Sequence, residues 1–284
     1  MILAPLAYQR PASLDGAVRA LAENPGARVL AGGQSLISVL KLRAARVDML
    51  VDISRLAELQ EIRRFDDGSI EIGAGVTYDR AARSEEVAAG HKIIAEVAAR
   101  TVDQQVRDRG TIGGNVCHAD PINNFPPLFV ALGATMQLIG PDGERSVPAE
   151  QFITGFYVTD VNPGEILRSI IVPPIAGGAG VGYVDIEIGE AVARAVAVIE
   201  TTGRRIDDAV VVVGCLPVPT RRPAVEDALR GGGTDEESVS AATSDAAEGL
   251  EPMSDPDASS DYRRAMIPVV TKRAVLAAVD EGGS

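Results

Sequence analysis

Two glycine-rich segments contain the residue types best suited to binding an anion. They read Ala31-Gly32-Gly33-Gln34-Ser35 and Gly110-Thr111-Ile112-Gly113-Gly114-Asn115. Glycine leaves room for backbone N–H groups to converge on an anion, and a helix expected after the first segment adds its positive N-terminal end. Ser35, Thr111 and Asn115 contribute hydroxyl or amide groups. Two such loops in one domain could hold a diphosphate from both sides.

Taken alone, each loop has a second interpretation. Neither contains the G-x-G-x-x-G of dinucleotide-binding βαβ units or the Gly-Lys-Ser/Thr of the P-loop. Each glycine pair is therefore equally compatible with a tight turn or a bulge. Arg107 and Arg109 precede the second loop and either reach a phosphate or remain solvated. The residues by themselves predict a soluble α+β protein that could bind a diphosphate-containing cofactor.

The elements that position the loops follow from hydrophobic periodicity and turn residues. A strand at 28–30 leads into the first loop, and a helix at 36–42 follows it. Ser13 predicts a helix cap, and Asp67-Gly68 predicts a hairpin. Further strands are expected at 47–53, 62–65, 69–72, 135–139 and 165–172, and further helices at 14–21, 85–100 and from Pro126 onward.

A linker-like segment at 173–180, rich in Pro, Gly and Ala, divides the chain. We therefore expect one domain at 1–174 and a second at 181–284. Strands followed by helices predict that the second is a small α+β domain. Its strands are expected at 192–200 and 209–213, with a turn at Thr202-Gly203, and its helices at 222–229, 235–248 and 262–279.

Composition excludes several classes of protein. The chain has 284 residues, of which 46% are hydrophobic and 24% charged, as in an ordinary soluble globular protein. It has no apolar run long enough to cross a bilayer and no signal-peptide pattern, so we expect a cytoplasmic protein. A net charge of −13 argues against nucleic-acid binding. Two cysteines cannot ligate an iron–sulfur cluster alone, so redox chemistry would need a bound organic cofactor.

The cysteines and histidines have plain structural interpretations. Cys117 and Cys215 are expected to be buried packing residues, although Cys117 follows Gly-Gly-Asn and could approach a cofactor. His118 is expected in a loop hydrogen bond, with a proton shuttle as the alternative. His91 is expected to be exposed. Two histidines leave no visible Ser–His–Asp arrangement.

The quoted loops resemble the paired signatures of a known family. Residues 31–36 resemble the A-G-G-x-S-L loop of the FAD-binding subunits of molybdopterin-containing dehydrogenases, the family of carbon monoxide dehydrogenase and xanthine dehydrogenase. Thr111-Ile112-Gly113-Gly114-Asn115, followed by His118-Ala119-Asp120-Pro121, resembles the second signature at the family's spacing. The resemblance continues at 163–167, 172–173, 219–223 and 262–264, and so covers nearly the whole chain.

The resemblance implies both a fold and a function. The fold is α+β, with a two-part FAD-binding domain of the vanillyl-alcohol-oxidase type followed by a small α/β C-terminal domain. The function is that of an oxidoreductase subunit, which passes electrons from the [2Fe–2S] clusters of a small partner subunit through FAD to an external acceptor. A large partner subunit would bind molybdenum–pterin and hydroxylate the substrate. The assembly implied is a dimer of heterotrimers.

The resemblance also implies a set of site residues. Segments 30–37 and 110–115 would hold the diphosphate, Asp120 and Asn123-Asn124 would lie near the ribityl chain and flavin, and Leu167 would pack on the isoalloxazine. No catalytic residue and no metal ligand is implied in this chain. The implied cofactor-binding residues are Leu30, Ala31, Gly32, Gly33, Gln34, Ser35, Leu36, Ile37, Gly110, Thr111, Gly113, Gly114, Asn115, Cys117, Asp120, Asn123, Asn124, Leu167 and Tyr183.

Two departures from the family pattern concern the flavin. Asn124 stands where many relatives have Asp, so it can bind a ribityl hydroxyl but brings no charge. Residues 184–188 contain no basic residue, whereas relatives often have one after the position of Tyr183. We therefore expect an acidic ring environment that lowers the flavin potential.

Two alternatives remain open at this point. One is a stand-alone FAD-dependent oxidoreductase, which would need its own substrate pocket and acid or base residues. The other is a flavin-free scaffold subunit, against which the intact glycine loops argue. The hydroxylated substrate and the final electron acceptor do not follow from the sequence, since the partner subunit would determine specificity.

Overall fold

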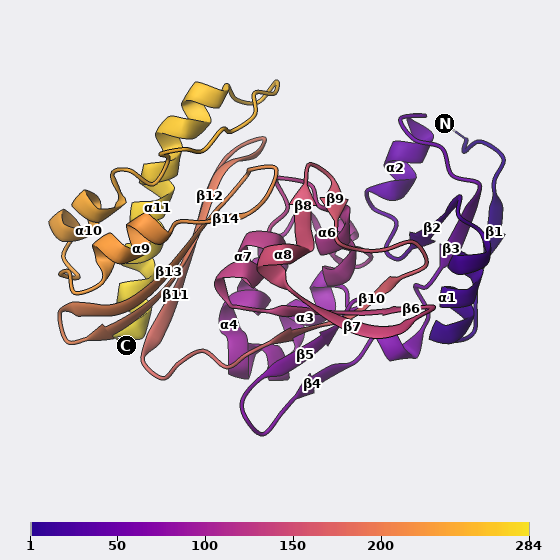
Figure 1. The fold of residues 1–284 in the computed structure, drawn as a ribbon, viewed down its shortest axis with the longest axis horizontal. Helices are drawn as coiled ribbons and strands as arrows, with labels where there is room; N and C mark the ends of the chain where they lie inside the picture. Colours follow the sequence, from indigo (N-terminus) through magenta and orange to yellow (C-terminus); the bar gives the residue numbers. More distant parts are fainter. Residues whose placement is uncertain (1, 284) are drawn as a thin grey trace. The chain divides into compact units, whose positions relative to one another are not determined.

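The computed structural model describes residues 2–283, which form two compact units (Figure 1). Unit 1 contains the chain up to His118, together with 135–152 and 159–174. Unit 2 contains 119–134, 153–158 and the chain from Ile175 onward. Both units are therefore assembled from separated segments of the sequence.

The first part of unit 1 is a small parallel sheet with the strand order β1-β3-β2. Ser13 caps the adjoining helix α1, because its Oγ accepts a hydrogen bond from the N–H of Gly16 at 3.2 Å. The apolar face of α1 is buried against this sheet. The elements are β1 (Ala7–Gln9), α1 (Leu14–Glu23), β2 (Ala27–Leu30), α2 (Leu36–Lys41), β3 (Met49–Asp52) and the 3₁₀ turn η1 (Ala57–Leu59).

The second part of unit 1 is an antiparallel sheet with the order β4-β5-β10-β6-β7. The late strand β10 lies at its centre and joins the β4–β5 hairpin to the β6–β7 hairpin. Its strands are β4 (Ile62–Arg64), β5 (Ile70–Gly73), β6 (Thr135–Gly140), β7 (Gly143–Pro148) and β10 (Ile166–Val172). Its helices are α3 (Tyr78–Arg83), α4 (Glu85–Arg100), α5 (Gln104–Arg107), α6 (Ile112–His118) and α8 (Ala149–Phe152).

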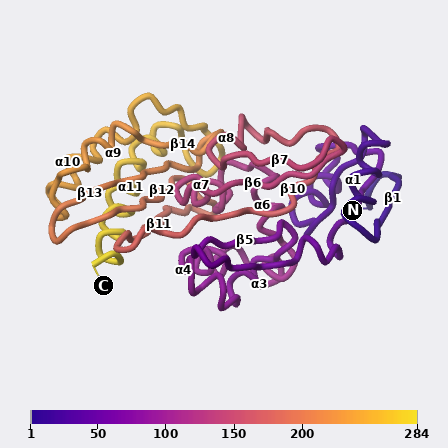
Figure 2. The backbone as a smooth tube through the Cα atoms, turned by 60° about the horizontal axis from the view of Figure 1, so that its bottom comes forward, coloured from indigo at the N-terminus to yellow at the C-terminus, as the bar shows by residue number. Residues whose placement is uncertain are grey.

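Unit 2 is an antiparallel sheet with the order β11-β12-β13-β14, along which the long helix α11 lies (Figure 2). Gly182 permits this packing, since a Cβ there would lie 1.8 Å from the carbonyl oxygen of Ala274. The strands are β8 (Ile153–Gly155), β9 (Val158–Thr159), β11 (Ala179–Ile188), β12 (Glu190–Thr202), β13 (Arg205–Gly214) and β14 (Thr220–Arg221). The helices are α7 (Phe125–Ala131), α9 (Pro223–Leu229), α10 (Glu236–Thr243) and α11 (Ser260–Gly282).

The strand β12 is buried along both faces, which explains its composition of alanine and valine. Ala193, Ala195 and Ala197 pack in the core formed with α9, α10 and α11. Arg194, on the opposite face of the strand, contacts the segment that precedes α7. Each face of the sheet is thus covered by a different part of the chain.

The expected α+β architecture and most of the expected elements are confirmed. Strand β11 was missed, because it begins inside the segment predicted to be a linker. The helix expected at 235–248 is shorter and ends at Thr243. Cys215 is buried as expected, whereas Cys117 is exposed, so that prediction was wrong. Within residues 2–283, no helix is both long and apolar enough to span a membrane.

The prediction that His91 is exposed was also wrong. His91 is fully buried and interrupts α4 with a non-helical backbone at φ −146° and ψ 64°. Its Nε2 lies 2.7 Å from the carbonyl oxygen of Pro173, so the neutral ring can donate a hydrogen bond there. Burial lowers the pKa of His91, and the bond to Pro173 only partly opposes this effect.

We expect His91 to make the free energy of unfolding depend on pH. The folded pKa is below 6.5, so the neutral ring stabilises the fold above about pH 6.5, and this contribution is lost as the pH falls. Urea unfolding at pH 7.5, 6.5 and 5.5 should show the advantage of the wild type over His91→Gln shrinking by up to about 1.4 kcal/mol per pH unit. An advantage that is constant across the three values would contradict this explanation.

Candidate functional site

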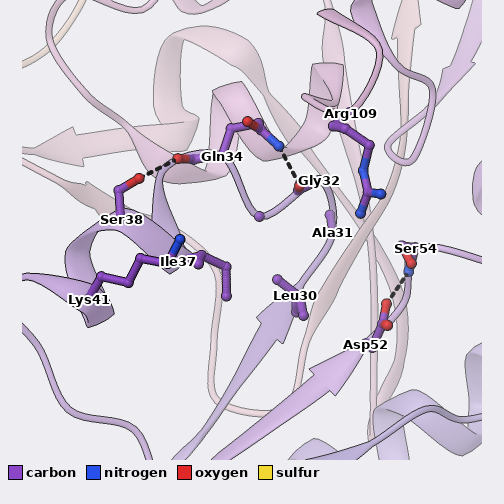
Figure 3. A pocket seen from close by; sticks show the side chains of 11 residues that line it. Leu30, Ala31, Gly32, Gln34, Ile37, Ser38, Lys41, Asp52, Ser54 and Arg109 are labelled. Atoms are coloured by element: carbon purple, nitrogen blue, oxygen red, sulfur yellow. Dashed lines mark hydrogen bonds between the residues drawn. The ribbon is translucent and has the colours of Figure 1, made fainter. Parts of the chain in front are cut away.

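Two neighbouring cavities in unit 1 are both lined by Gly32 and have volumes of about 300 and 350 Å³. They share five lining residues: Ala31, Gly32, Asp52, Ser54 and Arg109. The first, here called the α2-side cavity, is shown in Figure 3 and is also lined by Leu30, Gly33, Gln34, Ile37, Ser38 and Lys41. The second, the Thr111-side cavity, is also lined by Arg10, Arg55, Gln60, Gly75, Thr77, Asp108 and Thr111.

The first glycine loop connects the end of β2 to the start of α2. Gly33 has φ +74°, a conformation that favours glycine. Gly32 has no room for a side chain, because a Cβ would lie 2.1 Å from the carbonyl oxygen of Arg109. Ser35 stands at the N-terminus of α2, where its hydroxyl makes no capping hydrogen bond. The loop therefore presents mainly backbone to the cavities, and Ser35 itself lines neither of them.

The second glycine loop is fixed by pairing with residues 74–78. Tyr78 donates its N–H to the carbonyl of Gly110 at 3.0 Å, and Gly113 donates to the carbonyl of Ala74 at 3.0 Å. Gly113 also packs closely, since a Cβ there would lie 2.4 Å from the Cβ of Ala74. The Thr111 hydroxyl accepts from the N–H of Gly114 at 2.9 Å and so starts α6. The backbone of the loop is rigidly held in unit 1.

Asn115 is oriented inward rather than towards solvent. Its Nδ2 donates to the Tyr78 hydroxyl at 3.1 Å, and both side chains are buried. Burial raises the pKa of Tyr78 to about 12, so its hydroxyl stays protonated at neutral pH. Asn115 thus supports the loop from within the unit.

The structure brings the two loops together. The backbone of Arg109, immediately before the second loop, touches Gly32 of the first. Ala31, Gly32 and Thr111 line the same cavity. The predicted members of both segments are therefore neighbours, although Gly113 and Asn115 pack inside the unit and do not line either cavity.

Asp52 is an acidic residue that lines both cavities and was not predicted from the sequence. Burial opposes its ionisation, but hydrogen bonds from Ser54, Tyr8 and Arg10 outweigh that effect and lower the pKa of Asp52 to about 2. A signal was present in the pattern, because Asp52 ends β3 and the first loop follows the parallel strand β2. Carboxyl ends of parallel strands meet at one edge of a sheet.

The other predicted residues belong largely to unit 2. Asn123 and Asn124 surround Arg194, which is fully buried. Arg194 Nη1 donates to the carbonyls of Ile122 at 2.7 Å and Asn123 at 2.9 Å, and Nη2 donates to Asn124 Oδ1 at 2.8 Å. The Arg194 guanidinium also lies 5.6 Å from the centre of the Tyr183 ring.

Arg194 corrects the expectation of an acidic environment beside Tyr183. It stands opposite Asp185 in the register of β11 and β12, with Nη2 3.4 Å from the carboxylate. The absence of a basic residue at 184–188 was therefore misleading, because the positive charge comes from the neighbouring strand. A signal existed here too: Arg194 is the one charged residue within the apolar stretch 191–199.

Asp120 is held by Tyr157, which was also not predicted from the sequence. The Tyr157 hydroxyl donates to Asp120 Oδ2 at 2.6 Å, and the N–H of Ile122 donates to Oδ1 at 3.2 Å. Tyr157 and Ala119 both have positive φ, at +57° and +51°, which is uncommon outside glycine. Backbone strain of this kind concentrates at functional sites.

Leu167 and Cys117 both lie in unit 1, Leu167 far from the two loops in sequence and Cys117 two residues after the second loop. Leu167 is a buried residue of β10, next to a register shift between β10 and β6. Cys117 is in α6 and is exposed.

The residues around Gly32 fit a diphosphate-bearing cofactor. Gly32 lines both cavities and lets the two loops touch, since any side chain there would meet the carbonyl of Arg109. Four cationic side chains line the cavities, against two acidic ones. In a chain of net charge −13, that local surplus favours an anion.

Two family models match successive regions of the chain. Residues 4–175 match the family described as the FAD binding domain in molybdopterin dehydrogenase, and residues 190–278 match the CO dehydrogenase flavoprotein C-terminal domain. The chain is 36% identical over 276 residues to the carbon monoxide dehydrogenase medium chain of Hydrogenophaga pseudoflava, covering 95% of this chain and 96% of that one.

Two further relatives show the same degree of similarity. The glyceraldehyde dehydrogenase medium chain of Sulfolobus acidocaldarius is 36% identical over 272 residues, with 94% of this chain and 96% of that chain covered. Among solved structures, a chain of quinoline 2-oxidoreductase from Pseudomonas putida 86 superposes with a TM-score of 0.95 at 34% identity, and all of both chains is covered.

We expect Arg194→Met to lower the free energy of unfolding by about 3 kcal/mol, because it leaves Asp185, Asn124 and two carbonyls without their donor. Urea unfolding of the full chain measures this change. The control is Arg205→Met in the same unit, which removes an exposed ion pair with Asp207 and should change stability little. Equal stability of Arg194→Met and wild type would show that the buried cation is dispensable.

Proposed function

The chain belongs to the FAD-binding medium subunits of the molybdopterin-containing dehydrogenases, and from this membership we propose that it relays electrons and does not transform the substrate itself. A small partner subunit with [2Fe–2S] clusters delivers the electrons, and an external acceptor receives them. A large partner subunit binds molybdenum–pterin and hydroxylates the substrate. The complete assembly is a dimer of heterotrimers.

One observation supports this proposal most directly: the two glycine loops meet at Gly32, which lines both cavities. When bound, FAD supplies the capacity to accept and pass on electrons, and the chain binds and orients it. The proposed cofactor-binding residues are 30–37, Gly110, Thr111, Gly113, Gly114 and Asn115 for the diphosphate. For the flavin end they are Cys117, Asp120, Asn123, Asn124, Leu167 and Tyr183.

The chain's own residues divide this task by position. Gly32 allows the two loops to touch and Gly33 adopts the positive φ of the first loop, while Asn115 acts indirectly by fixing the second loop to Tyr78. Thr111 can still donate its hydroxyl hydrogen, because the capping bond uses only the oxygen as acceptor. Binding is thus achieved mainly by backbone geometry.

We further propose a division into a FAD-binding domain at 1–174 and a C-terminal domain at 181–284, and a cytoplasmic location. The two matched family regions support the division. Both cysteines are free, in keeping with a reducing compartment.

We assign the choice of substrate to the partner subunit. Relatives with 34–36% identity are named for carbon monoxide, glyceraldehyde and quinoline, which share little chemistry. Similar medium chains therefore serve different reactions. The alternative of a stand-alone oxidoreductase is disfavoured, because two of the three relatives are named as medium chains, that is, as parts of larger enzymes.

We expect Gly32→Ala to lower FAD affinity at least tenfold, because the added Cβ forces the loop away from the carbonyl of Arg109. Flavin fluorescence quenching by the apo chain measures the affinity, and absorbance measures FAD per chain. Gly177→Ala is the control, since nothing lies within 4 Å of a Cβ there and its φ is not positive. Full FAD occupancy in Gly32→Ala would contradict the role of the loop.

Isolation of the native complex tests the electron-relay function. The chain should co-purify with two partner subunits, molybdenum, iron and about one FAD per chain. Substrate added without oxygen should bleach the flavin absorbance. A chain that carries FAD, comes alone and oxidises a substrate by itself would instead establish the stand-alone enzyme.

A further inference from the structure

In the Thr111-side cavity the acidic side chains have partners, whereas some of the cationic side chains do not. Its acidic side chains are already engaged: Asp52 binds Tyr8 and Arg10, and Asp108 accepts from Gln104 Nε2 at 2.6 Å. Arg10 is likewise neutralised by Asp52. The cationic side chains that remain without an ion-pair partner among residues 2–283 are Arg55 and Arg109 here, and Lys41 in the α2-side cavity.

Arg109 differs from Arg55 and Lys41 because its backbone is part of the glycine-loop contact. Its carbonyl oxygen would lie 2.1 Å from a Cβ at position 32, so Gly32 and Arg109 are in direct contact. Its N–H donates to the carbonyl of Val106 at 3.1 Å, and the next residue is fixed by the bond from Tyr78 to Gly110. The start of the Arg109 side chain is therefore held against the first loop.

The Arg109 side chain is directed along the cavities. Figure 3 shows it running past Ala31 towards Ser54. It lines both cavities, yet its guanidinium makes no hydrogen bond or ion pair with any residue that the structure describes. Its neighbour Arg107 behaves differently, since Nη1 bonds the carbonyl of Val102 and Nη2 bonds Gln104 at 3.0 Å.

We propose that Arg109 is a cofactor-binding residue that places its guanidinium on the diphosphate of FAD. A guanidinium forms charge-assisted, often bidentate bonds with phosphate oxygens, whereas the backbone N–H groups of glycine loops carry only partial charges. Arg109 thus supplies the full positive charge that the two loops lack. This inference rests on the proposed function, because it requires FAD at the two loops.

The apo full-length chain is titrated with FAD at 50 mM and 500 mM NaCl, and flavin fluorescence quenching gives Kd. We expect Arg109→Ala to bind FAD about tenfold more weakly than wild type at 50 mM NaCl. The difference should shrink at 500 mM NaCl, where salt screens the pair. Arg109→Lys should recover part of the affinity, because it restores the charge without the planar fork.

Arg107→Ala is the matched control, as it removes the same charge two residues away and outside both cavities. It should change Kd less than twofold. An affinity for FAD that is unchanged in Arg109→Ala overturns the inference and leaves the proposed function intact. A loss of equal size at both salt concentrations, with a lowered Tm of the apo chain, also overturns it. A wild-type chain that does not bind FAD overturns both.

Discussion

The contact between Gly32 and the backbone of Arg109 is the constraint on which the candidate site depends. Two loops from distant parts of the sequence meet there with no space for a side chain. The parallel pairing of β2 and β3 fixes one loop, and pairing with residues 74–78 fixes the other. Because both loops are fixed at one contact, the cavities that Gly32 and Arg109 line have fixed walls, which favours binding without large rearrangement.

The two glycine loops could be found from the sequence because their information is local. Glycine pairs next to hydroxyl and amide residues form a recognisable string, and hydrophobic periodicity placed the flanking elements. Contacts between residues that are distant in the sequence could not be predicted in the same way. Arg194 pairs with Asp185 only through the register of two strands, and His91 is buried because Pro173 lies against it. In each case the sequence showed the residue but not the distant group that determines its environment.

The backbone around Gly32 and the backbone around Arg194 are stabilised by different means. Around Gly32, the absence of side chains allows close approach and leaves polar groups facing open space. Around Arg194, a single buried cation satisfies three oxygen acceptors of the segment 122–124. Such a network is costly to leave half-satisfied, so it favours a single conformation of that segment.

Because the units are built from separated segments, the chain cannot fold in the order in which it is synthesised. Helix α7, with Phe125 and Phe129 fully buried in the folded protein, packs on β12 and β13 of unit 2, which leave the ribosome much later. At a translation rate of about 5–20 residues per second, the partner strands of this apolar helix are made on the order of several seconds after it. During that interval its apolar side chains are exposed, and other nascent chains or chaperones can bind them. The same arrangement prevents a polypeptide that stops near residue 174 from burying α7, so unit 2 is complete only when its C-terminal strands have been made.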